Sequence, residues 1–463
     1  MTQQSLFSAF ALPQALLETL DSLAFHHPTP VQALSLPIIL AGKDLLAQAA
    51  TGSGKTAAFA LGILSKLNVK RFRIQSLVLC PTRELAEQVA TEIRTLARGI
   101  HNIKVLTLCG GVPSKGQTLS LEHGAHIIVG TPGRVLDHLQ QQNLQLDELS
   151  ILVLDEADRM LEMGFADDMR QIIAATPAKR QQLLFSATFA PAVKKLAAEL
   201  LNTPEQVIIE SRAAETRILQ EFYLLTDSNA RSNATIRLLL AKMPGSCVIF
   251  ANTRKEVQNL TEQLKRAGFS VAALHGDLEQ REREQQLLQF ANGSLQLLVA
   301  TDVAARGLDI EKLDLVINYE LAHDTDTHIH RIGRTGRAGE QGVACTLYTE
   351  QDGYKIGLLE DAFAQTIQPE PLPESGNNKA PQPAMVTIEI DGGKKQKLRP
   401  ADIVGALTRN ELVAFTEIGK IQLQEFKAYV AVKRAVLKTA LQQLNNSKIK
   451  GRSFRAYRLT PES

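Results

Sequence analysis

The chain has 463 residues, 44% of them hydrophobic, which is enough for more than one domain with its own core. It contains no run of eighteen apolar residues, and its first ten residues lack the basic and apolar segments of a signal peptide, so we expect no membrane partner. The four cysteines are scattered without metal-binding spacing. This pattern predicts reduced core thiols and a cytoplasmic protein.

The net charge of +2 hides an uneven distribution along the chain. Residues 375–463 contain 16 basic and 7 acidic residues, a net charge of +9, so the rest of the chain carries −7. A small basic end on a mildly acidic body favours a nucleic-acid-binding module attached to a larger catalytic body. A soluble basic domain without such a partner is the alternative.

The segment AATGSGKT, residues 49–56, fits the phosphate-loop pattern G-x-x-x-x-G-K-[ST] with alanine at the first glycine. Its glycines allow backbone N–H groups to point at a phosphate in front of a helix N-terminus. The lysine can reach the β- and γ-phosphates of a nucleotide, and the threonine hydroxyl can bind Mg²⁺. A plain Gly/Ser turn is the alternative. The predicted nucleotide-binding residues here are Ala50, Thr51, Gly52, Ser53, Gly54, Lys55 and Thr56.

A cluster of acids follows in LVLDEADRM, residues 152–160, where an apolar run ends in Asp155 and Glu156. Acids also suit a solvated helix N-terminus. With a phosphate loop upstream, a cation site is the sharper interpretation. We predict that Asp155, with Thr56, holds Mg²⁺ partly through water, and that Glu156 orients and deprotonates the attacking water. We expect Asp158 to couple this motif to another one.

Short Val/Ile/Leu runs alternate with helical patterns over most of the chain, which is typical of parallel sheets covered by helices on both faces. The rhythm pauses near Ser211 and then restarts, so we predict two α/β domains, residues 1–210 and 211–366. The Pro-rich segment 367–384 reads as a flexible linker. Residues 385–463 are predicted to form a small α+β domain.

The basic end shows the order β-α-β-β-α-β, which resembles an RNA recognition motif. Its aromatic signature is poor: only Tyr429 remains of the expected base-stacking residues, which puts the usual stacking platform in doubt. Basic residues cluster instead in two segments. The predicted RNA-binding residues of this domain are Lys394, Lys395, Lys397, Arg399, Lys448, Lys450 and Arg452.

From about Leu6 to Ala364 the sequence resembles the DEAD-box RNA helicases, named for the residues at 155–158. The resemblance implies two RecA-like domains and ATP-dependent opening of short RNA duplexes. FHHPTPVQ, residues 25–32, resembles the family's adenine-reading motif. There the amide of Gln32 can pair with adenine N6 and N7 and so select ATP. Phe7 lies at the spacing where the family places an aromatic ring near the base.

The same resemblance supplies the remaining site residues. PTRELA, GG and TPGR, in residues 81–86, 110–111 and 131–134, are similar to the family's contacts to the RNA backbone, and SAT, residues 186–188, to its coupling motif. ATDVAARGLDI and HRIGRTGR, residues 300–310 and 330–337, complete the set. The resemblance implies that Pro81, Thr82, Arg83, Gly111, Thr131, Arg134 and Thr301 bind RNA, Asp302 contacts the ribose, and Arg334 and Arg337 act as arginine fingers beside Lys55, Asp155 and Glu156.

The combination of helicase core, Pro-rich linker and basic tail is similar to a bacterial subfamily. That similarity implies binding to a hairpin of 23S ribosomal RNA and action on precursors of the 50S ribosomal subunit. A monomer is the default expectation. Three alternatives stay open. One is a clamp that closes on RNA without unwinding it, and another is a DNA helicase. The third is a tail with a purely structural role, docked on the core.

Overall fold

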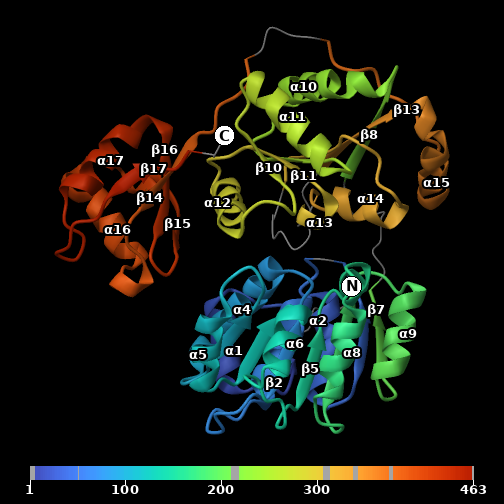
Figure 1. Cartoon of the computed structure of the whole chain (residues 1–463), viewed down its shortest axis with the longest axis vertical. Coiled ribbons are helices and arrows are strands. Elements are labelled where there is room, and N and C mark those ends of the chain that lie inside the picture. The colour runs from blue at the N-terminus through green and yellow to red at the C-terminus, as the bar shows by residue number, and fades with distance from the viewer. Residues whose placement is uncertain are drawn as a thin grey trace. The chain divides into compact units, whose positions relative to one another are not determined.

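The protein, in a computed structural model, is described over residues 6–50, 52–209, 218–305, 313–336, 342–374 and 379–460, without the side chains of residues 305 and 410. Two compact units are present, one formed by the described residues up to 209 and one by those from 218 onward (Figure 1). The predicted joint at Ser211 and the predicted site residues Thr51 and Arg337 lie outside the described residues. The predicted domain boundaries stay a prediction.

In the described part of the first unit, seven parallel strands form one sheet in the order β3-β4-β2-β5-β6-β1-β7. The strands are β1 Leu45–Gln48, β2 Ser76–Leu79, β3 Val105–Leu108, β4 Ile127–Gly130, β5 Ile151–Leu154, β6 Gln181–Ser186 and β7 Glu205–Ile208. The helices are α1 Gln14–Ser22, α2 Pro30–Leu40, α3 Lys55–Lys66, α4 Arg83–Leu96, α5 Ser114–Glu122, α6 Pro132–Gln140, α7 Ala157–Glu162, α8 Ala166–Ala174 and α9 Pro191–Leu200.

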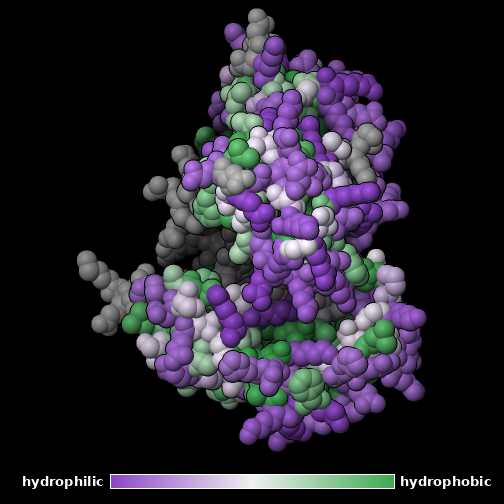
Figure 2. All heavy atoms as spheres, turned by 90° about the vertical axis from the view of Figure 1, so that its left-hand side faces the viewer, coloured by the Kyte–Doolittle hydropathy of each residue, from purple (hydrophilic) through white to green (hydrophobic). Residues whose placement is uncertain are grey.

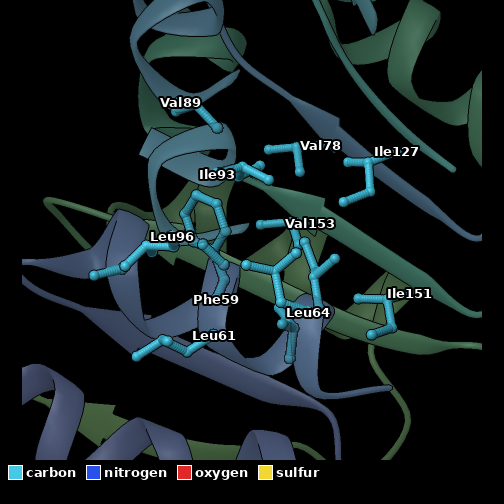
Figure 3. Close-up of a cluster of buried hydrophobic side chains, with 14 of the residues drawn as sticks. Phe59, Leu61, Leu64, Val78, Val89, Ile93, Leu96, Ile127, Ile151 and Val153 are labelled. Carbon is cyan, nitrogen blue, oxygen red and sulfur yellow. The ribbon is translucent and has the colours of Figure 1, made fainter. Parts of the chain in front are cut away.

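Helices cover both faces of this sheet, so successive residues of a strand enter different cores. Val153 belongs to one hydrophobic cluster, and its neighbours Leu152 and Leu154 belong to the other. Figure 3 shows the first cluster, where side chains from α3, α4 and the strands point toward one another: Phe59, Leu61, Leu64, Val78, Val89, Ile93, Leu96, Ile127, Ile151 and Val153. The unbroken apolar runs in the sequence follow from this two-sided burial.

The strand order decides which motifs become neighbours, because the carboxyl ends of parallel strands share one edge of the sheet. The phosphate loop follows β1, SAT follows β6 and the acidic motif follows β5, and these three strands are adjacent. The segments predicted to bind RNA follow β2, β3 and β4, which form the other half of the sheet. The motifs predicted to bind ATP and those predicted to bind RNA therefore occupy two halves of one edge.

The second unit holds a parallel sheet whose described strands run in the order β10-β11-β9-β12-β13-β8. The strands are β8 Ile218–Leu225, β9 Cys247–Phe250, β10 Val271–Leu274, β11 Leu297–Ala300, β12 Leu315–Asn318 and β13 Gly342–Thr349. The helices are α10 Arg231–Lys242, α11 Arg254–Arg266, α12 Gln280–Ala291, α13 Asp302–Ala305, α14 Thr325–Ile332 and α15 Gly353–Phe363. Together with the first sheet it confirms the predicted pair of RecA-like domains.

The basic end of the chain forms a C-terminal module, residues 385–460, with the predicted order β-α-β-β-α-β. Its antiparallel sheet runs in the order β15-β16-β14-β17. The elements are β14 Met385–Ile390, α16 Pro400–Leu407, β15 Ile418–Leu423, β16 Ala428–Lys433, α17 Leu437–Asn446 and β17 Ala456–Arg458. The predicted small α+β domain is confirmed.

The segment predicted to be a flexible linker makes defined contacts in its described parts. Arg237 of α10 donates to the carbonyl oxygens of Leu372 and Pro373, at 3.3 and 2.8 Å. The Glu370 N–H donates to the carbonyl of Phe222 at 2.7 Å, and Leu372 packs against the core of the second sheet. The composition is that of a linker, but its few apolar residues and free carbonyl groups attach it to the domain that precedes it.

Hydrophilic residues predominate on the face of the molecule shown in Figure 2. Among the described residues no helix is both long enough and apolar enough to cross a membrane.

Candidate nucleotide and RNA site

The phosphate loop connects β1 to α3 with a backbone that only glycine adopts easily. Gly52 and Gly54 have φ values of +79° and +95°, and Gly54 is the N-cap of α3. Lys55 is buried, and its Nζ donates to the carbonyl oxygen of Ala49 at 2.8 Å, which folds the lysine back over the loop. The Ser53 hydroxyl is buried without a hydrogen-bond partner among the described residues. The loop thus offers an ammonium group, a hydroxyl and helix N–H groups to an anion.

Replacing Gly54 by alanine is expected to abolish ATP binding. A Cβ atom there would lie 2.5 Å from Nε2 and 3.2 Å from Cδ of Gln32, and φ is +95°. Relieving this clash moves either the loop or Gln32, and the strained backbone adds about 1 kcal/mol or more. Titration with a fluorescent ATP analogue measures the loss. Gly164→Ala is the control, because its φ is +83° but no atom lies within 4 Å of its Cβ position. Wild-type affinity in Gly54→Ala would contradict the expectation.

The three acids after β5 are all buried: Asp155, Glu156 and Asp158. Glu156 is the N-cap of α7 and has left-handed backbone angles, φ 54° and ψ 52°. A non-glycine residue in this region costs free energy, and such residues concentrate at functional sites. The turn directs two consecutive carboxylates into one buried site at the edge of the sheet.

Burial raises the pKa of Asp155 to about 7, while the Lys55 ammonium lowers it and Glu156 raises it further. Its Oδ1 is buried without a hydrogen-bond partner among the described residues. A carboxylate in this position gains from a nearby cation. No three His, Cys, Asp or Glu side chains form a metal cage in the described chain, and Mg²⁺ bound with a nucleotide needs only one or two protein oxygens. The residues fit that mode of binding.

Asp155→Asn is expected to stabilise the nucleotide-free protein while ATP hydrolysis is lost. The folded-state pKa of about 7 lies above the ordinary value of 3.8, so the folded chain holds the proton more tightly. The unfolded chain is ionised first as the pH rises, and stability is therefore lost between about pH 4 and pH 7 and stays lost above pH 7. The neutral amide removes this cost. We expect a free energy of unfolding about 1–3 kcal/mol higher at pH 8, with the difference vanishing near pH 4. Urea denaturation at both pH values tests this. The exposed Asp167→Asn should change neither value, and a less stable Asp155→Asn at pH 8 would refute the argument.

Asp158 joins the acidic motif to SAT, as the sequence predicted in general terms. Its Oδ2 accepts hydrogen bonds from the Ala187 and Thr188 N–H groups at 3.1 and 3.0 Å, and from the Thr188 hydroxyl at 3.3 Å. Asp158 thus ties the end of β5 to the end of β6, within the half of the edge that holds the phosphate loop.

The predicted adenine-reading residues are both buried. Gln32 accepts from the Thr29 N–H at 2.9 Å and donates to the Gly54 carbonyl at 3.1 Å, so its amide links the start of α2 to the phosphate loop. Phe7 belongs to the hydrophobic core, with its ring 6.3 Å from that of Phe10. Gln32 would have to exchange these bonds to pair with adenine, and that role stays a prediction.

Helix N-termini dominate the half of the edge predicted to bind RNA. Thr82 is the N-cap of α4 and stands between Pro81 and Arg83. Thr131 is the N-cap of α6, and Arg134 lies in the first turn of that helix. Both guanidinium nitrogens of Arg134 donate to the Val112 carbonyl at 3.0 Å. This contact brings TPGR against the Gly110–Gly111 turn, where Gly111 has a φ of +80°.

In the second unit Asp302, the predicted ribose contact, forms a bidentate ion pair with Arg331. Arg331 donates to its two carboxylate oxygens at 2.6 and 2.8 Å, and also to the Asn252 side chain and the Glu320 carbonyl, both at 2.7 Å. The sequence analysis missed Arg331 and Asn252. Arg331 stood within the quoted motif, but nothing in the pattern shows which of its arginines turns inward. Arg334 is buried too, and Thr301 directly precedes α13.

The basic residues predicted in the C-terminal module lie in loops at one end of its sheet. Lys394 and Lys395 follow β14, and their N–H groups donate to Gln424 and Glu425 of the turn between β15 and β16, at 2.9 and 2.8 Å. Lys450, in the loop between α17 and β17, donates to the carbonyl of Lys397 at 2.8 Å. The two predicted basic segments are thereby brought together with the turn at residues 424–427.

A phosphate loop and a buried acidic pair at the edge of one parallel sheet, with a second such sheet in the same chain, define a P-loop nucleoside triphosphatase of the two-domain helicase type.

Comparisons with known proteins carry the identification further. The DEAD/DEAH box helicase model matches residues 29–196, the helicase conserved C-terminal domain matches 230–339, and the DbpA RNA binding domain matches 387–458. The ATP-dependent RNA helicase DbpA of Escherichia coli is 49% identical over 96% of this chain and 97% of its own length. DbpA of Bacillus subtilis is 34% identical over 97% and 98%. The chain therefore belongs to the DEAD-box ATP-dependent RNA helicases, and within them to the DbpA type.

A solved structure supports the same conclusion for the core. Saccharomyces cerevisiae Dbp5, bound to RNA and ADP BeF3, matches with a TM-score of 0.72 and 32% identity over 78% of this chain and 95% of that one. The predicted family and enzyme class are confirmed, with ATP as the nucleotide used and RNA as the partner.

Proposed function

We propose that this helicase is directed by its C-terminal module to a hairpin of 23S ribosomal RNA and acts in the cytoplasm, as a monomer, on precursors of the 50S subunit. The observation that carries the proposal is the match of residues 387–458 to the DbpA RNA binding domain, on a module whose basic residues gather at one end of its sheet. A module that holds RNA raises the effective concentration of the catalytic domains beside neighbouring duplexes.

In the catalytic step we propose separate tasks for the residues of the first unit. Lys55 leaves the Ala49 carbonyl to bind the β- and γ-phosphates, and Thr56 and Asp155 hold Mg²⁺. When bound, Mg²⁺ neutralises charge that develops on the phosphate oxygens. Glu156 receives the proton of the attacking water. Arg334 and Arg337 of the second unit stabilise charge on the transferred phosphoryl group, and Asp302 contacts the ribose.

The RNA contacts that we propose for the first unit carry no sequence information. Helix N-termini at Thr82 and Thr131 offer N–H groups to phosphates, and Arg134 holds the neighbouring glycine turn in place. Selection of one RNA therefore falls to the C-terminal module. In this arrangement the two helicase domains act on RNA of any sequence, and the C-terminal module selects the RNA.

The test is ATP turnover with 23S ribosomal RNA, 16S ribosomal RNA and a generic duplex, with Lys55→Ala as the inactive control. We expect strong stimulation by 23S RNA alone in the wild type. Combined Lys394→Ala and Arg452→Ala should remove that preference, whereas Lys433→Ala with Lys438→Ala, exposed lysines elsewhere on the module, should retain it. Equal stimulation by all three RNAs in the wild type would refute targeting and leave the helicase activity untouched.

A further inference from the structure

The second helicase domain covers the outward face of the two central strands of the module's sheet, β14 and β16. Thr387, Glu389 and Tyr429 point away from the module's own core, yet all three are buried. Asn292, after α12, donates to the Thr387 hydroxyl at 2.8 Å, and Gln285 of α12 donates to Glu389 at 3.4 Å. Tyr429 was the one stacking residue that the sequence retained, and it lies beneath this cover. The centre of the sheet face is thus occupied by an intramolecular contact, while Tyr457 on the edge strand β17 is 44% exposed.

The charge on this face also gives it little attraction for RNA. Glu389, the fifth of the six residues of β14, is almost completely buried, and its carboxylate accepts hydrogen bonds from the Lys427 ammonium and the Tyr457 hydroxyl. Lys427 therefore neutralises Glu389. Opening the face would expose this ion pair, which offers no net positive charge to a phosphate backbone.

The exposed alternative is the end of the sheet where three loops meet. These loops are residues 391–399, 424–427 and 447–455, joined by the backbone hydrogen bonds of Lys394 and Lys395 to the turn and by a bond from the Asp391 N–H to the Arg455 carbonyl at 2.9 Å. At the tip of the turn stands Phe426, with 59% of its surface exposed. Glu425 beside it pairs with Lys395 at 3.1 Å, and the same loop also carries the exposed Lys394.

We propose that Phe426 is a base-stacking residue that binds an unpaired nucleobase of RNA, while the surrounding lysines and arginines contact the adjacent phosphates. An exposed aromatic ring on a turn joined to basic loops is the arrangement with which proteins bind single-stranded nucleic acid. The ring costs stability in water, and a base covering it removes apolar surface from solvent. The proposal rests on RNA binding by the module and identifies the loop end, not the sheet face, as the site.

A second exposed phenylalanine provides a matched control. Phe415 is 71% exposed and lies in the turn at residues 415–417 just before β15, whose first residue Ile418 pairs with Val432. It therefore stands toward the opposite end of the sheet from Phe426, which precedes β16. Both side chains are exposed enough to be replaced without loss of the fold. The chain has no tryptophan, so Phe426→Trp or Phe415→Trp introduces a single fluorescent reporter into the full-length protein.

The experiment titrates each tryptophan variant with an RNA hairpin that has an unpaired loop and with a blunt duplex of the same stem. We expect the hairpin to quench the tryptophan at 426 and the duplex to leave it bright, with no change at 415 for either RNA. In anisotropy titrations Phe426→Ala should weaken hairpin binding about tenfold or more, and Phe415→Ala less than twofold. Phe426→Trp should retain binding, because a larger ring also stacks.

Equal quenching at both positions, or wild-type hairpin affinity in Phe426→Ala, would overturn the proposal. Failure of 23S targeting gives a different result. In that case the wild type binds a 23S hairpin no better than another hairpin of equal length, yet Phe426→Ala still weakens the binding of both.

Discussion

Glu156→Gln is expected to lower the rate of RNA-stimulated ATP hydrolysis by about 10²–10⁴-fold, the range that a positioned general base contributes. The amide keeps the size of the side chain and cannot accept the proton of the attacking water. The buried, left-handed turn that presents Glu156 beside Asp155 should persist, because the backbone angles do not depend on the charge. ATP affinity should therefore change little, and a single-turnover assay with saturating RNA measures the hydrolytic step itself.

The control for this prediction is Glu162→Gln, at the last residue of the same short helix α7, where the carboxylate is half exposed and pairs with Arg159 at 3.2 Å. It should hydrolyse ATP at close to the wild-type rate. A Glu156→Gln variant with undiminished turnover would mean that another group takes the proton. One that fails to bind ATP would mean that Glu156 supports the loop rather than the chemistry. The two failures are separated by measuring nucleotide binding and hydrolysis on the same sample.

Much of the catalytic core could be predicted from the sequence because its signals are local. Apolar runs such as residues 151–154 are buried on both faces, and a strand of a doubly covered parallel sheet requires this. The phosphate loop and the acids after β5 can be recognised in the sequence because few other structures require these residue types at this spacing. Their meeting at one edge follows from strand order, which no single motif encodes.

Partnerships between distant elements could not be predicted in the same way. Nothing in the sequence indicates that Asp302 and Arg331, which are 29 positions apart, form an ion pair. The pair forms because α13 and α14 approach each other in the fold. The cover over Tyr429 likewise arises from Gln285 and Asn292, residues that look like ordinary helix surface. A module docked on the core is one of the alternatives that the sequence leaves open, and the long Pro-rich linker argues against it. The bonds from Arg237 to that segment show that such composition does not prevent attachment.

Arg331→Ala is expected to lower the free energy of unfolding of the second unit by about 3–5 kcal/mol, the cost of leaving a buried ion without its partner. Its guanidinium is almost fully buried, lies 5.2 Å from the ring centroid of Phe250, and satisfies Asp302, Asn252 and the Glu320 carbonyl at once. Urea denaturation followed by circular dichroism measures the loss. The control is Arg266→Ala on α11, an exposed i,i+4 pair with Glu262 at 3.4 Å, for which we expect about 0.5 kcal/mol or less.

A double variant separates the charge from the packing at this position. In Arg331→Met with Asp302→Leu the buried guanidinium and the partly buried carboxylate are both gone, so the penalty for an unpaired carboxylate disappears and much of the lost stability should return. Recovery will be partial, since Asn252 and the Glu320 carbonyl still lack their donor. ATP hydrolysis should stay lost in the double variant, because the proposed ribose contact has been removed with Asp302. Full stability together with wild-type ATP hydrolysis in the double variant would show that neither residue contacts the nucleotide. A double variant no more stable than Arg331→Ala would show that the stability lost in Arg331→Ala comes from packing and hydrogen bonds rather than from the unpaired charge of Asp302.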